Sequence, residues 1–84
     1  MTPKDLLKRV RERPFRPFRL VLSEGTPYEV RHPEQIMVAR DSAVIGLPGS
    51  EQDLFETTVL VDLFHIVRLE PISATTVTGN GQGA

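Results

Sequence analysis

Residues 13–19 repeat the tripeptide Arg-Pro-Phe and constrain the fold more than any other part of the chain. A proline has no backbone N–H to donate, and it disfavours helical geometry in the residue before it. Pro14 and Pro17 therefore end any helix that begins upstream. Residues 18–22 then alternate in polarity as a half-buried strand does. Residues 13–19 therefore predict a short N-terminal helix that is joined directly to a β-rich remainder.

The first residues carry a strong helix-start signal. Thr2 can cap the first turn with its hydroxyl, Pro3 fits the first helical position, and an acid follows three positions after the cap. Leu6 and Val10 then recur at helical spacing and form an apolar stripe. We expect a helix over roughly residues 3–12. Because a helix of about ten residues does not persist alone in water, it must dock on the rest of the domain.

The remaining chain predicts about five short strands. They are residues 18–22, 28–31 with a resumption at 35–40, 43–47, 55–62 and 66–70. The second is bent at Pro33, because proline cannot donate to a strand ladder and marks an edge, bend or bulge. A single tight turn at residues 62–65 precedes the last strand, which Pro71 ends. The expected fold class is mainly β with one N-terminal α-helix.

A chain of 84 residues forms one domain with a small core. We place this domain at residues 1–72 and expect residues 73–84, which are small and polar, to be a disordered tail. Cysteine is absent, which excludes a disulfide framework, thiolate zinc ligands and thiol catalysis. No apolar run approaches the roughly 18 residues that span a bilayer, and the N-terminus lacks a signal-peptide core. We expect a cytoplasmic protein without a membrane partner.

The order of elements is similar to that of small SH3-like and Sm-like barrels. This similarity implies a five-stranded antiparallel barrel, in which closure removes exposed strand edges. The alternative is an open antiparallel sheet covered by the helix. Three blocks also resemble a family of short uncharacterised proteins of planctomycete-type bacteria: Arg-Pro-Phe-Arg-Pro-Phe-Arg-Leu at 13–20, Val-Arg-His-Pro-Glu at 30–34 and Val-Asp-Leu-Phe-His-Ile at 61–66. That resemblance implies a small-domain family and assigns no catalytic or binding residue.

Charge is divided unevenly along the chain. Residues 1–19 hold seven basic and two acidic residues, a net charge of +5, and residues 20–84 hold three basic and nine acidic residues, a net charge of −6. The candidate anion or nucleic-acid face comprises the helix cations and those just beyond them, Lys4, Lys8, Arg11, Arg13, Arg16 and Arg19. Such cations can track a phosphate backbone. They can equally pair with the acidic remainder of the same chain or of a neighbouring copy.

No residue pattern in the chain predicts catalysis, a metal or a cofactor. His32 lies near Glu34 and His65 near Asp62, but zinc sites need three or four convergent ligands at recognised spacings. The chain has neither a Gly-x-Ser-x-Gly nucleophile motif nor a phosphate-binding glycine loop. We therefore expect a non-enzymatic protein that uses no cofactor.

Protein–protein contact, including self-association, is the function that we expect. The core is small for a lone chain, and residues 57–61, Thr-Thr-Val-Leu-Val, are apolar enough on both faces to need cover. Val59 and Val61 are the candidate self-association residues of this strand. The expected partner is another protein or a second copy of the chain.

Two nucleotide-binding functions are alternatives. The similarity to Sm-like proteins implies RNA binding through the basic face, although their signature turn is replaced here by Phe64-His65, in which only His65 is a candidate contact. A minor alternative is cyclic-dinucleotide binding of the PilZ kind, because Arg9 and Arg13 fit its Arg-x-x-x-Arg motif. Residues 41–46 depart from the second PilZ motif, since the serine directly follows the aspartate and the glycine comes one residue late.

Overall fold

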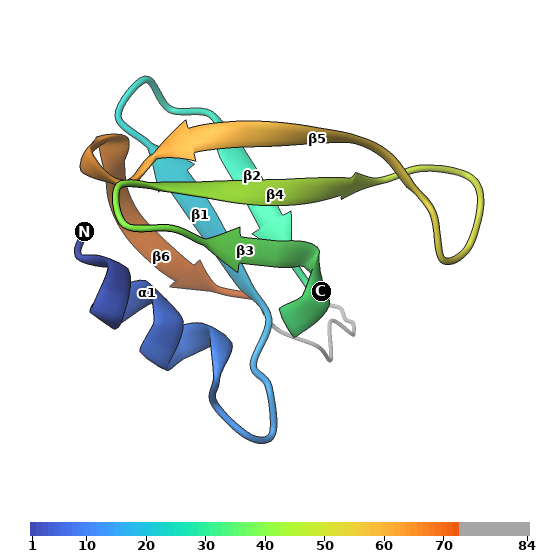
Figure 1. The fold of residues 1–84 in the computed structure, drawn as a ribbon, viewed down its shortest axis with the longest axis horizontal. Coiled ribbons are helices and arrows are strands. Elements are labelled where there is room, and N and C mark those ends of the chain that lie inside the picture. Colours follow the sequence, from blue (N-terminus) through green and yellow to red (C-terminus); the bar gives the residue numbers. More distant parts are fainter. Residues whose placement is uncertain (73–84) are drawn as a thin grey trace, which may run out of the picture.

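The computed structural model describes residues 1–72, and its strands form two antiparallel sheets. In chain order, the elements of this range are α1 (Pro3–Val10), β1 (Phe18–Leu22), β2 (Pro27–Val30), the 3-10 turn η1 (Pro33–Gln35), β3 (Ile36–Val38), β4 (Ser42–Pro48), β5 (Phe55–Asp62), the 3-10 turn η2 (Leu63–His65) and β6 (Ile66–Pro71). The two sheets have the strand orders β2-β1-β6 and β3-β4-β5. Figure 1 shows the second sheet in front of the first, with α1 on the side of β3 and β6.

The prediction of a five-stranded barrel is wrong. The described residues form six strands in two separate three-stranded sheets, and neither sheet closes on itself. The chain passes between the sheets through η1 and again through η2, so the strand ladder is interrupted at both corners. At η1 the cause is Pro33, which cannot donate to a ladder. The alternative of one open sheet is wrong for the same reason, whereas the mainly β composition with an N-terminal helix is confirmed.

The core lies between the two sheets and is closed at one side by α1. Side chains alternate between the faces of a strand, so each sheet contributes every second residue. The buried cluster consists of Leu6, Val10, Phe18, Leu20, Val30, Ile36, Ala43, Ile45, Val61, Leu63 and Ile66. Its members come from both sheets, α1 and η2, so the separate sheets share a single core.

The start of α1 confirms the sequence signal. The Thr2 hydroxyl accepts a hydrogen bond from the Asp5 N–H at 3.1 Å, and Pro3 occupies the first turn. The helix docks through Leu6 and Val10 and ends at Val10, slightly earlier than expected. Within residues 1–72, no helix combines the length and hydropathy that a bilayer crossing requires.

Gln35 is a buried polar side chain that joins the two sheets. Its Nε2 donates to the carbonyl of Glu29 at 2.7 Å and to the carbonyl of Gly46 at 2.9 Å. Its Oε1 accepts from the backbone N–H of Arg31 at 2.8 Å. Glu29 belongs to β2 and Gly46 to β4. The amide therefore satisfies backbone groups of both sheets at the corner where the ladder stops.

We expect Gln35→Met to lower the free energy of unfolding by roughly 2–4 kcal/mol, because the buried Gly46 carbonyl loses its partner at a cost of about 1–3 kcal/mol and the half-buried Glu29 and Arg31 backbone groups add a smaller cost. Urea denaturation measures this change. Gln52→Met, in the exposed β4–β5 loop, is the matched control and should stay within about 0.5 kcal/mol of the parent. An unchanged urea midpoint for Gln35→Met would contradict the bridging role.

Candidate functional site

The sheet β3-β4-β5 carries a row of apolar side chains on the face away from the core. Met37 of β3, Val44 of β4 and Leu60 of β5 are direct cross-strand neighbours. Met37 and Leu60 are each 71% exposed. We call these three residues the outer apolar row. Because it crosses all three strands, the row forms one continuous contact surface rather than scattered exposed side chains.

Phe55 and Gly46 extend this surface. A Cβ placed on Gly46 would lie 2.6 Å from the Phe55 ring, so the ring can cover this backbone only because residue 46 is glycine. Thr58 is the register partner of Gly46 on the same face. Together with Met37 and Val44, these residues line a shallow hollow. The outer face thus combines exposed apolar side chains with a notch that a partner's side chain can enter.

β5 is an edge strand, paired with β4 on one side and with no described strand on the other. It has eight residues, and its central residues 57–61 contain neither a charge nor a proline. The other edge strands are shorter; β2 begins with Pro27, β6 ends with Pro71, and β3 has three residues beside α1. Charges, prolines and short length normally protect an edge from pairing with another chain. The centre of β5 has none of these protections.

The hydrogen-bond pattern shows which backbone groups of β5 face its free side. The Leu63 N–H donates to the Asp41 carbonyl at 2.9 Å, one step beyond the last pair of the β4–β5 ladder. Directly opposite residues of an antiparallel ladder alternate between bonded and non-bonded pairs. From Thr57 to Val61, where the register is regular, odd-numbered residues of β5 therefore bond toward β4, as Leu63 does. The backbone groups on the free side are those of Thr58, Leu60 and Asp62.

The structure places the predicted self-association residues Val59 and Val61 on the inner side of β5. Val61 is 4% exposed, and Val59 is partly buried against the core. Leu60 between them points outward, in the outer apolar row. The strand therefore meets solvent through Leu60 and its free backbone groups rather than through the two valine side chains.

Arg19 of the predicted basic face belongs instead to an ion-pair ladder across the other sheet. It lies directly between Glu29 and Glu70 in the strand register, at 3.1 Å and 3.3 Å from their carboxylates. Arg31 pairs with Glu29 at 2.9 Å, and Arg68 pairs with Glu70 at 2.7 Å. We call these five residues the charged ladder. It covers the outer face of β2-β1-β6 with matched charges.

Two further residues of the predicted basic face are held within the N-terminal segment. Arg16 donates twice to the Glu12 carboxylate, at 3.1 Å each. Arg13 donates to the backbone carbonyls of Val10 and Glu12. The other three are exposed and form no ion pair within residues 1–72; they are Lys4, Lys8 and Arg11. Within the predicted basic face, the cations without an ion pair therefore lie on α1 and at its C-terminal end.

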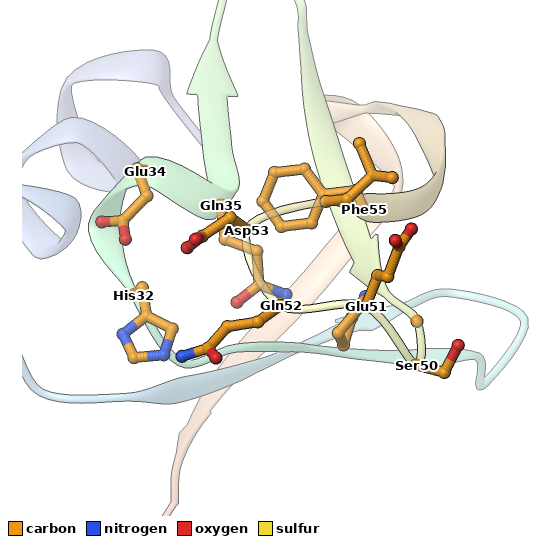
Figure 2. A pocket seen from close by; sticks show the side chains of 11 residues that line it. His32, Glu34, Gln35, Ser50, Glu51, Gln52, Asp53 and Phe55 are labelled. Carbon is orange, nitrogen blue, oxygen red and sulfur yellow. The ribbon is translucent and has the colours of Figure 1, made fainter.

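An open hollow of about 640 Å³ lies between η1 and the β4–β5 loop, lined by His32 and by residues 48–55 (Figure 2). Glu34, Glu51 and Asp53 bring carboxylates to its rim. In the described part of the chain, no three metal-ligating side chains gather at one point. The hollow is acidic and open, and its walls bring no metal-ligand set together.

Sequence reasoning missed the outward-facing residues of this surface, above all Leu60 and Met37. Residues 57–61 offer apolar or neutral side chains on both faces, so no alternation distinguishes inside from outside. Asp62 is the residue from which the outer face of this strand could have been assigned. If this carboxylate faces solvent, the two-residue period of a strand places Thr58 and Leu60 on the same outer face.

Comparisons with protein-family models, curated proteins and solved structures found no match to this chain. The resemblances drawn from the sequence therefore stay predictions. The features of the molecule that bear on function are the outer apolar row, the free edge of β5 and the distribution of charge.

We expect the charged ladder to make stability depend on pH in the acidic range. The pKa of Glu29 is lowered from 4.5 by hydrogen bonds from Arg19 and Arg31, and the pKa of Glu70 is lowered by those from Arg68 and Arg19. Because both carboxyls are more acidic when folded, their contribution is complete above the unfolded pKa and is lost as the pH falls through the folded pKa.

Arg19→Gln should therefore reduce the slope of unfolding free energy against pH between about pH 5 and pH 3. Urea denaturation at a series of pH values measures the slope. Arg40→Gln is the matched control, because Arg40 is exposed and outside the charged ladder. Equal slopes for Arg19→Gln and the parent chain would show that the ladder does not set the acid sensitivity.

Proposed function

We propose that this protein is a non-enzymatic contact module that docks onto protein partners, including a second copy of itself. The docking surface is the outer face of β3-β4-β5 together with the free side of β5. One observation carries the proposal: an eight-residue edge strand with an uncharged centre borders a continuous apolar row. An edge of this kind recruits an additional strand through backbone hydrogen bonds, while neighbouring side chains supply specificity.

The chemistry of the surface supports contact rather than catalysis. Its side chains are those of Met37, Val44, Phe55, Thr58 and Leu60, and none of these side chains titrates near neutral pH. Removing such apolar area from water favours association by roughly 25 cal/mol for each Å² buried. Because the core of the domain is small, apolar area buried by a partner adds a larger share of its total stability.

RNA binding through α1 is the alternative proposal. Lys4, Lys8 and Arg11 are exposed and would be its phosphate contacts. It has less support than protein contact, because the other three cations of the predicted face are engaged within the chain. Cyclic-dinucleotide binding of the PilZ kind has even less support. The Arg9 guanidinium lies 5.4 Å from the Phe18 ring centroid, and Arg13 is bound to backbone carbonyls.

Light-scattering mass after size exclusion tests the proposal. We expect the parent chain to exceed its single-chain mass of 9.4 kDa, also at about 0.5 M salt, since apolar association is not screened by ions. Leu60→Lys should return the mass to one chain, because it places a charge in the outer apolar row. Val67→Lys is the matched control: Val67 is 54% exposed on β6, and its variant should keep the parent mass.

The combined variant Lys8→Glu and Arg11→Glu distinguishes RNA binding from protein contact. Under the contact proposal it keeps the parent mass, and the absorbance ratio at 260 and 280 nm is that of protein alone. A parent chain that stays monomeric at all concentrations would contradict the proposal. Bound nucleic acid that is lost in this variant, with affinity falling steeply as salt rises, would favour RNA binding instead.

A further inference from the structure

We infer that the partner at the free side of β5 is a second copy of the chain, paired antiparallel through β5 about a two-fold axis at Leu60. This inference rests on the proposed function and specifies the partner and the register. The resulting assembly is a symmetric dimer in which both copies present the same surface. It joins two β3-β4-β5 sheets into one continuous sheet.

The backbone of β5 already has the required geometry. The N–H and C=O groups of Leu60 face the free side, as deduced from the Leu63–Asp41 bond and the alternation of the ladder. Across a two-fold axis at this residue, the two copies of Leu60 exchange both hydrogen bonds. Thr58 of each copy then exchanges bonds with Asp62 of the other, because these residues also face the free side.

Side-chain direction limits the registers that a symmetric pair can adopt. A two-fold axis perpendicular to the sheet keeps every side chain on its own face, so one residue of β5 must lie on the axis. An axis at Val59 brings Glu56, which lies at the bulge of β5, next to Asp62 of the second copy. Like charges in direct cross-strand pairs are destabilising. An axis at Thr57 leaves Leu60 without a partner inside β5 (Phe55–Asp62).

The neighbouring registers conflict with the position of Leu60. An axis at Thr58 brings Leu60 to Glu56 at the bulge of β5, and an axis at Val61 places Leu60 opposite Asp62. Both pair an exposed leucine with a carboxylate. Only the axis at Leu60 places leucine opposite leucine and gives Asp62 a neutral partner, Thr58. Charge and polarity therefore select this register among the symmetric ones.

The selected register also uses the apolar residues on both faces of β5. On the outer face, the outer apolar row continues directly into the same row of the second copy through the two leucines. On the inner face, Val59 lies opposite Val61 of the second copy, which extends the core side of the sheet. The two valines singled out in the sequence therefore lie opposite each other in this register, on the inner side of the joined sheet, although their side chains are already turned toward the core of the single chain.

Cysteine cross-linking tests the register, because the natural chain has no cysteine. Leu60→Cys should form a disulfide-linked dimer on mild oxidation, since residues of a bonded antiparallel pair have Cα atoms about 5.5 Å apart, within disulfide range. Thr58→Cys should not link to itself, because its two copies are displaced by four residues, about 13 Å along the strand. A mixture of Thr58→Cys and Asp62→Cys should form the mixed dimer and tests the register with Leu60 intact.

Val67→Cys is the control for random collision, since Val67 is exposed on the other sheet. Leu60→Cys should cross-link at least about tenfold faster at micromolar concentration, because the dimer raises the effective concentration of its thiol. Self-linking of Thr58→Cys in a chain of doubled mass would overturn the register and leave the proposed function standing. A parent chain of single mass, with no variant linking faster than the control, would overturn both.

Discussion

A side-chain amide joins the two sheets of this domain at the corner where the strand ladder stops. Pro33 and η1 interrupt the strand ladder between β2 and β3. The Gln35 side chain hydrogen-bonds to the backbone groups of both sheets that lose a ladder partner there. At the other corner, the Ser23 N–H donates to the His65 carbonyl at 2.8 Å and holds η2 against β1. Backbone groups at both corners thus have hydrogen-bond partners within the protein. Unpaired backbone groups remain along the edge strands, of which β5 is the longest.

The outer faces of the two sheets differ in chemistry, and this difference locates the contact surface. The face of β2-β1-β6 carries the charged ladder, in which Arg19 bridges Glu29 and Glu70 and like charges are kept apart. The face of β3-β4-β5 carries the outer apolar row, whose members Met37 and Leu60 are mostly exposed. A partner that covers the charged ladder would have to desolvate matched ion pairs, whereas a partner on the apolar row removes hydrocarbon from water.

Features decided by neighbouring residues could be predicted from the sequence. Pro3 marks the start of α1 and Pro33 marks a break between strands, because proline acts on its own backbone and its neighbours. Closure into a barrel was predicted wrongly, since pairing across a corner depends on packing between distant segments. The outward direction of Leu60 was missed because its strand is apolar on both faces. Gln35 was not singled out, since its role exists only where β2 and β4 approach each other.

Amide hydrogen exchange over a range of protein concentrations tests the central claim, that the free side of β5 is the contact surface. The Leu60 N–H faces the free side, and the Val61 N–H bonds to β4 and serves as an internal reference. The account predicts that protection of the Leu60 amide rises with concentration together with the measured mass, while protection of Val61 stays constant. A mass that doubles while the Leu60 amide exchanges at an unchanged rate would place the contact elsewhere and contradict the account.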